Sequence, residues 1–115
     1  MHSTLNYCFT ALAGIFIFSC SPVFAASAEK GQAAFTRHGC WQCHGFSGQG
    51  GSAGLRLAPD PKPLETIIAF IRSTDGPMPP FSEKILSDED VADIYAYLSS
   101  IPKARDYKSI PLLAR

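Results

Sequence analysis

Two cysteines and a histidine stand close enough in the chain to act on one chemical group. Cys40 and Cys43 are separated by two residues, and His44 follows directly, within the stretch GCWQCHG. Three chemistries use these residue types at this spacing: a tetrahedral zinc site, a dithiol that cycles with its disulfide, and a haem attached through two thioethers. The surrounding sequence has to favour one of them.

Zinc and the dithiol receive little support from the rest of the chain. A structural zinc ion takes four ligands from two separated pairs, and only His38 lies near the motif as a further candidate. Cys43 and His44 are adjacent and would both have to turn toward one small ion. A thioredoxin-like dithiol belongs to a βαβ pattern, and no alternating, β-branched segment flanks the motif. Both interpretations therefore stay weak alternatives.

Covalent haem attachment uses all three side chains. C-x-x-C-H is the signature of c-type haem, in which the two thiols add to vinyl groups on one porphyrin edge and the histidine binds the iron. A chain of 115 residues also has a small hydrophobic core, and a large apolar ring bound to the native state would stabilise it. We therefore expect one covalently attached haem c.

A second axial ligand is expected from the stretch PMPP, which holds Met78. The prolines prevent a helix and fix the backbone in an extended course. Met78 is the only methionine besides Met1, and an iron with a proximal histidine commonly takes methionine opposite it. We therefore predict His44 and Met78 as the axial ligands. His38 is the rival, but it is tethered two residues before Cys40 and is expected on the surface or at a helix end.

The periodic segments predict an all-α fold without strands. A first helix is expected over residues 28–38, where helix formers precede Gly39, and the glycine- and proline-rich segment 45–63 is expected to be a loop. A second helix should run from residue 64 or 65 to 72 or 73, and a third from the Ser87 N-cap to residue 99 or 100. The predicted fold is all-α, with three to four short helices around one covalently attached haem.

The first 25 residues have the pattern of a cleaved secretory signal peptide. An apolar stretch spans residues 9–18, and small residues follow at Ala25 and Ala26, so we predict cleavage after Ala25, with Ala28 as second choice. Residues 26–115 then form a single domain. Its irregular tail is expected from about residue 102, held down by three apolar residues, Ile110, Leu112 and Leu113.

Export also determines the compartment and the cysteine count. Cys8 and Cys20 would leave with the signal, so only Cys40 and Cys43 remain and no disulfide framework is possible. Haem c is assembled outside the cytoplasm in bacteria, so the predicted location is the periplasm. Two alternatives stay open. The apolar stretch could be retained as an anchor, or Cys20 could be acylated, because residues 17–20 loosely resemble a lipoprotein cleavage box.

The charged residues balance and show no nucleic-acid pattern. Ten basic and ten acidic residues give a formal net charge of zero. Acidic residues gather between positions 83 and 93, whereas basic residues prevail from Lys103 onward, and no run of Lys or Arg suggests a nucleic-acid partner. Solvated helix and tail charges are the favoured interpretation, and a weak docking dipole is the functional alternative.

The chain resembles the class I c-type cytochromes, the small monohaem electron carriers of bacterial periplasm and mitochondria. CWQCH and the later Met78 carry this resemblance most strongly. Weaker matches are Gly31 with Phe35 in the first helix and Ile94 with Tyr97 in the last. They imply that these two helices cross, with the glycine allowing a close approach.

Two further roles follow from this resemblance, which covers nearly all of residues 28–101. Where the family usually has Gly-Pro, this chain has Gly54-Leu55. The Leu55 carbonyl is expected to accept a hydrogen bond from the second ring nitrogen of His44, because a proximal histidine normally has such an acceptor. Arg56 is expected to meet a haem propionate, with a solvated loop arginine as the alternative.

The resemblance implies an electron carrier and not an enzyme. The chain would move single electrons as a free shuttle or as the electron-accepting cytochrome of a dehydrogenase, because residues 77–98 also resemble cytochrome subunits of periplasmic dehydrogenases. Expected partners are redox proteins: a periplasmic dehydrogenase and a terminal oxidase or reductase. No nucleic acid and no transmembrane segment of the mature form are expected, and the state is a monomer or a heteromeric subunit. Gly45, Phe46 and residues 79–81 are expected to form an apolar rim for partners.

Two rivals from other classes stay open. A haem-based ligand sensor or gas-binding protein would carry a Met78 that its ligand displaces. A peroxidase-like enzyme would need an open iron and a distal acid–base residue, for which His2 and His38 are poor candidates.

Overall fold

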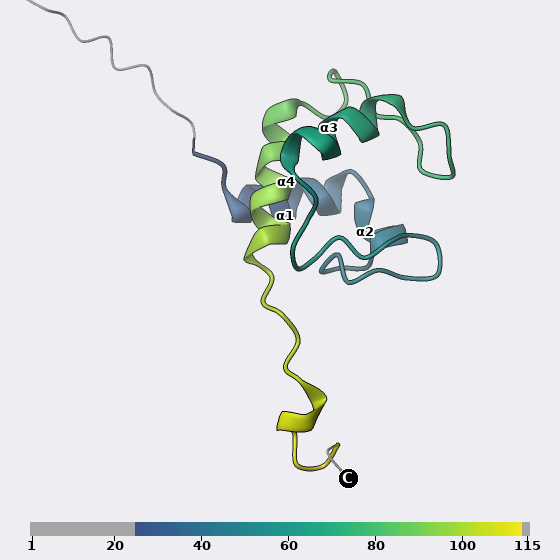
Figure 1. The fold of residues 1–115 in the computed structure, drawn as a ribbon. Helices are drawn as coiled ribbons and strands as arrows, with labels where there is room; N and C mark the ends of the chain where they lie inside the picture. The colour runs from purple at the N-terminus through teal and green to yellow at the C-terminus, as the bar shows by residue number, and fades with distance from the viewer. Residues whose placement is uncertain (1–24, 114–115) are drawn as a thin grey trace, which may run out of the picture.

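The computed structural model describes residues 25–113, which fold into helices without a strand (Figure 1). The four α-helices and one 3-10 turn are α1 (Ala28–Arg37), α2 (Cys40–His44), α3 (Leu64–Ser73), α4 (Asp88–Ser100) and η1 (Tyr107–Ser109). The predicted all-α class is therefore confirmed. The predicted signal peptide, apart from Ala25, lies outside the described residues.

The first helix begins and ends at the residues that cap it. The Ser27 hydroxyl accepts a hydrogen bond from the backbone N–H of Lys30, so one of the free amides at the start of α1 is satisfied. Gly39 has a φ of 74°, the left-handed conformation that commonly ends a helix. The same residue is the N-cap of α2, so the chain enters the cysteine motif directly from α1.

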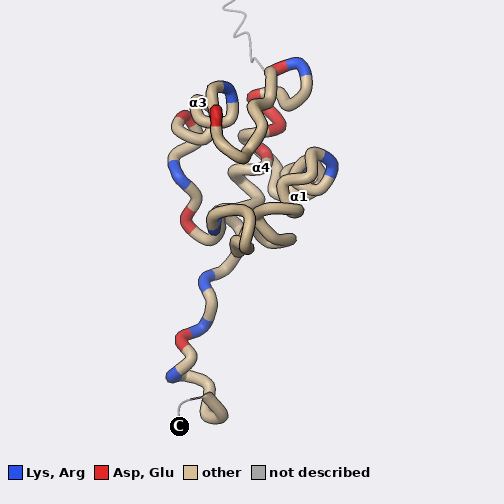
Figure 2. The backbone as a smooth tube through the Cα atoms, turned by 90° about the vertical axis from the view of Figure 1, so that its right-hand side faces the viewer, with Lys and Arg blue, Asp and Glu red and all other residues tan. Residues whose placement is uncertain are grey.

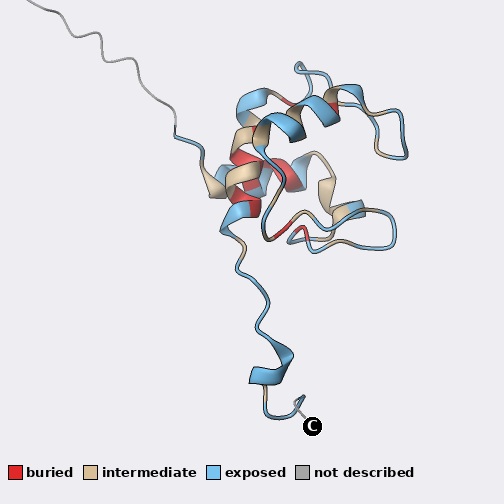
Figure 3. Ribbon diagram, viewed as in Figure 1, coloured by how far each residue is buried: buried red, intermediate tan, exposed pale blue. Residues whose placement is uncertain are grey.

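The core lies where α1 crosses α4 (Figures 1 and 3). A Cβ atom on Gly31 would lie only 1.9 Å from the backbone oxygen of Asp93, so the two backbones meet at a point that only glycine permits. The rings of Phe35 and Tyr97 pack beside this point with their centroids 5.8 Å apart. The predicted crossing of the first and last helices is therefore confirmed.

The rest of the core comes from α3, from the loop after α2 and from the segment before α4. Ile71 of α3, Ala58 of the loop and Leu86 before α4 belong to the buried cluster, and Phe81 and Ile67 pack against it. Among residues 25–113, the buried apolar residues are Ala34, Phe35, Ala58, Ile71, Leu86, Val91, Ile94, Tyr97 and Leu98.

Asp93 departs from the expectation that the acidic residues between positions 83 and 93 are solvated. Its side chain is buried, with 5% of the residue exposed, and it accepts a hydrogen bond of 2.6 Å from the backbone N–H of Ser27. A buried carboxylate requires such a partner. For Asp93 the solvated interpretation is therefore wrong, because this residue fastens the start of α1 to α4.

The tail after Ile101 leaves the helical body (Figure 1). Figure 2 shows that basic positions prevail over acidic ones along it, beyond the helices. Lys103 pairs with Asp60 at 2.9 Å, but both side chains are largely exposed. Leu112 and Leu113 are 79% and 59% exposed, so the prediction that they hold the tail down is wrong. Within residues 25–113, no helix is long and apolar enough to span a membrane.

Candidate functional site

The two cysteines lie on one face of α2. They are three residues apart on a single helical turn, a spacing that places side chains side by side. Both are free thiols rather than a disulfide; Cys40 is half-buried and Cys43 is exposed. α2 therefore presents two neighbouring thiols with different access to solvent.

The environment of Cys40 argues against a redox-active dithiol. Burial raises the pKa of the Cys40 thiol, and a hydrogen bond to its own backbone opposes this only in part. A nucleophilic cysteine of a thioredoxin-like pair needs a lowered pKa, because the thiolate is the reactive form. The shift at Cys40 is thus opposite to the one that a reactive dithiol needs.

His44 ends α2 with one ring nitrogen already occupied. Its Nδ1 lies 2.7 Å from the carbonyl oxygen of Leu55, the residue implied by the family resemblance. A carbonyl only accepts hydrogen bonds, so this contact assigns the proton to Nδ1 and leaves the lone pair on Nε2. The bond also fixes the ring plane, as the partner of a metal-binding imidazole does. His44 therefore has one free ligating nitrogen in a fixed orientation.

Gly54 makes the contact between His44 and Leu55 possible. A Cβ atom at this position would lie 2.7 Å from the backbone oxygen of Cys43 and 2.9 Å from Nδ1 of His44. Both distances are shorter than real Cβ atoms tolerate. The loop after α2 can therefore fold back under the imidazole only because residue 54 has no side chain. The glycine-rich composition predicts a loop here but does not single out this glycine.

Aromatic residues next to the motif connect it to the core. The rings of Trp41 and Phe46 stack with centroids 4.7 Å apart and planes 10° from parallel. The Tyr97 hydroxyl donates a hydrogen bond of 3.0 Å to the Phe46 carbonyl. The residues on either side of His44 are thus held by each other and by α4.

Met78 lies in the segment that follows α3. It is half-buried and packs against the core cluster. The Thr74 hydroxyl lies 3.4 Å from the Met78 carbonyl, and the Phe81 N–H donates to the Ile71 carbonyl at 2.8 Å. In Figure 1 this segment and α2, with the loop after it, extend to the same side of the α1–α4 pair. The fold thus brings the two predicted ligand segments to one side of the molecule.

Arg56 and His38 take different positions from the motif residues. Arg56 is exposed beside Leu55 and lines a surface hollow of about 530 Å³ together with Asp60 and Lys103. His38 caps the C-terminus of α1, as predicted for a helix end, but it is half-buried and packs edge-on against Phe81 at 6.5 Å. Its Nε2 is buried and has no hydrogen-bond partner within the described residues.

The residues around α2 fit a covalently bound haem better than they fit zinc. Two unbridged thiols share one helix face, and the adjacent imidazole keeps Nε2 free because Nδ1 is bonded to a carbonyl. Within residues 25–113, no three His, Cys, Asp or Glu side chains converge so that they could hold a metal ion. These residues therefore fit a haem c, in which Cys40 and Cys43 would hold the porphyrin and His44 would bind the iron.

Comparison with known proteins agrees with this donor set. A family model described as cytochrome c oxidase, cbb3-type, subunit III matches residues 26–98, which is more than half of the chain and includes the motif and Met78. No curated protein and no solved structure matches significantly. The chain therefore belongs to this family and is a class I c-type cytochrome, whose haem serves electron transfer.

Proposed function

We propose that this chain is a periplasmic one-electron carrier with haem c bound through Cys40 and Cys43 and with His44 and Met78 as axial ligands. The observation that carries the proposal is the 2.7 Å contact between His44 Nδ1 and the Leu55 carbonyl, which leaves Nε2 as the ligating atom. When bound, the haem supplies an iron that alternates between its ferrous and ferric states. The residues of the chain hold and shield that iron.

The residues proposed to surround the haem have distinct effects on it. The Leu55 carbonyl keeps the proton on Nδ1 and increases the basicity of the His44 ring. A methionine ligand and apolar surroundings both favour a relatively high reduction potential. The stacked rings of Trp41 and Phe46 hold the residues on both sides of Cys43 and His44 in place. Arg56 is exposed next to Leu55, where its charge is available to a haem propionate.

Exposed apolar residues near the motif support contact with redox partners. Phe46 is 68% exposed and Leu55 is 80% exposed, while Pro79 and Pro80 are also on the surface. Small patches of this kind suit transient redox encounters. The family description favours a terminal oxidase as one partner. A periplasmic dehydrogenase is the proposed electron donor, whether the chain is a free shuttle or a dedicated subunit.

The contacts of Ser27 favour cleavage after Ala25 over cleavage after Ala28. Ser27 caps α1 and donates its N–H to the buried Asp93, so a cut after Ala28 would remove both interactions. A cut after Ala25 preserves them. Intact-mass measurement of the periplasmic protein should give a chain that begins at Ala26. A chain beginning at Glu29, or a diacylglycerol-modified Cys20, would contradict this processing.

The axial assignment is tested by spectra of the holoprotein and of Met78→Ala. The wild type should show the weak near-infrared charge-transfer band from sulfur to ferric iron, and the variant should lose it and have a lower potential. Haem should remain with the polypeptide in acidic acetone, but should be extracted from a Cys40→Ala/Cys43→Ala double variant. If the ferric wild type lacks the band and the ferrous wild type binds carbon monoxide readily, the electron-carrier proposal is wrong and the protein is a ligand-binding haem protein.

A further inference from the structure

Met78 lies in a loop with few hydrogen bonds of its own. We define the Met78 loop as residues 74–80, between the end of α3 and Phe81. Three of its seven positions are prolines and have no backbone N–H. The Thr74 hydroxyl lies 3.4 Å from both the Met78 carbonyl and the Gly76 nitrogen, which is long for a hydrogen bond. The position of Met78 therefore depends on how the two ends of the loop are held.

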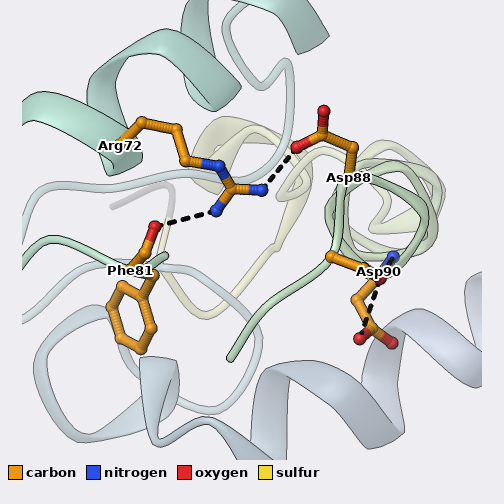
Figure 4. A network of polar contacts seen from close by, with 5 residues as sticks. Arg72, Phe81, Asp88 and Asp90 are labelled. Carbon is orange, nitrogen blue, oxygen red and sulfur yellow. Dashed lines mark hydrogen bonds and ion pairs between the residues drawn. The ribbon is translucent and has the colours of Figure 1, made fainter. Parts of the chain in front are cut away.

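The far end of the loop is fastened at the Phe81 peptide. The Phe81 N–H donates to the Ile71 carbonyl at 2.8 Å. Nη1 of Arg72 donates to the Phe81 carbonyl at 2.9 Å, as Figure 4 shows. Both partners belong to the last turn of α3, where the loop also begins. The Met78 loop is thus closed on itself by two adjacent residues of one helix.

Arg72 is itself held in the orientation that this contact requires. Its side chain is only 22% exposed, and its Nη2 pairs with the carboxylate of Asp88 in the first turn of α4. A planar guanidinium can donate in two directions at once, so one side chain binds the Phe81 carbonyl and the Asp88 carboxylate together. The positive charge also lies at the C-terminus of α3 and the negative charge at the N-terminus of α4, where each is favourable.

We propose that Arg72 is a positioning residue for Met78. By holding the Phe81 peptide against α3 and α4, it keeps the Met78 sulfur at the iron and opposes its displacement by other ligands. The inference rests on the axial role of Met78 proposed above. The ordinary alternative is that Arg72 contributes only to stability, as a partly buried ion pair between two helices would.

A second arginine–aspartate pair supplies a matched control. Arg37 donates to Asp90 at 3.1 Å, so it also joins a helix to the first turn of α4, but its partners do not include the Met78 loop. The ferric holoproteins of wild type, Arg72→Gln and Arg37→Gln are titrated with imidazole, which competes with the methionine sulfur. The near-infrared sulfur-to-iron band is followed in the same titration.

Arg72→Gln should bind imidazole about tenfold more tightly than the wild type, which corresponds to about 1.4 kcal/mol. Its near-infrared band should weaken before imidazole is added. Arg37→Gln should stay within about twofold of the wild type. Arg72→Lys retains the charge and a donor without the planar fork, so its affinity should lie between those of the wild type and Arg72→Gln.

Equal imidazole affinities in Arg72→Gln and Arg37→Gln would overturn the positioning role. A wrong axial assignment would give a different result. The wild type would then lack the near-infrared band, and Met78→Ala would leave the spectrum unchanged. If Arg72→Gln does not accumulate as holoprotein, the variants Asp88→Asn and Asp90→Asn are compared in place of Arg72→Gln and Arg37→Gln. Asp88→Asn should then bind imidazole at least threefold more tightly than Asp90→Asn, and equal values would refute the proposal.

Discussion

At the residue scale, the orientation of the His44 imidazole depends on Gly54, because glycine has no side chain. Gly54→Ala places a methyl group 2.7 Å from the Cys43 carbonyl oxygen and 2.9 Å from His44 Nδ1. The loop must shift away, at a cost of about 1–3 kcal/mol of unfolding free energy. The His44–Leu55 hydrogen bond should lengthen as well. A less basic imidazole stabilises ferric iron less, so the reduction potential should rise.

Thermal unfolding and spectroelectrochemical titration of the holoprotein measure both effects. Gly76→Ala is the control for the melting temperature, because the nearest atom to a Cβ there is the Thr74 hydroxyl at 3.9 Å. A Gly54→Ala protein with the melting temperature of Gly76→Ala and the potential of the wild type would show that the loop tolerates the methyl group.

Single residues differ in how far the sequence predicts them. The position of the Leu55 carbonyl follows from the family resemblance even though the usual proline is absent, because any residue supplies a carbonyl. The burial of Asp93 and the two contacts of Arg72 were not predicted. Asp93 binds the backbone of a residue 66 positions away, and such pairing depends on the helix crossing rather than on local composition.

At the element scale, the crossing of α1 and α4 depends on Gly31. Gly31→Ala would place a Cβ atom 1.9 Å from the Asp93 carbonyl oxygen, and the contacting atom is backbone that cannot rotate away. The helices must separate and loosen the Phe35–Tyr97 contact, so we expect a loss of about 3–5 kcal/mol. Chemical denaturation followed by circular dichroism measures it. Gln32→Ala, on the exposed face of the same helix, should change stability by less than about 0.5 kcal/mol; similar losses in both variants would contradict the close crossing.

The three longer helices match the predicted ones within one residue at each end, because their caps and stops are local signals. Ser87 caps α4 through a hydrogen bond to the Asp90 N–H, and α3 follows directly after Pro63. The short helix α2 was missed. Gly39 was interpreted only as the end of the first helix, yet its left-handed conformation also starts the five-residue helix that carries both cysteines.

At the scale of the whole molecule, the tail contributes little to the folded body. Removing residues 103–115 eliminates the Lys103–Asp60 pair, in which both side chains are more than two-thirds exposed. Exposed pairs of this kind are worth about 1 kcal/mol or less, so the melting temperature should barely change. The truncated protein should bind an anion exchanger more strongly, because four basic residues and one acidic residue are lost. A marked loss of stability would mean that the tail packs against the helices.

The backbone of Leu55 faces inward to His44 while its side chain points into solvent, with 80% of the residue exposed. A substitution scan that reads the haem spectrum should therefore be silent at position 55 and sensitive at position 54. This separation makes residue 55 suitable for a photo-cross-linking amino acid. Such a side chain would lie beside the electron-transfer site without altering it, and could capture the donor or acceptor during a transient encounter.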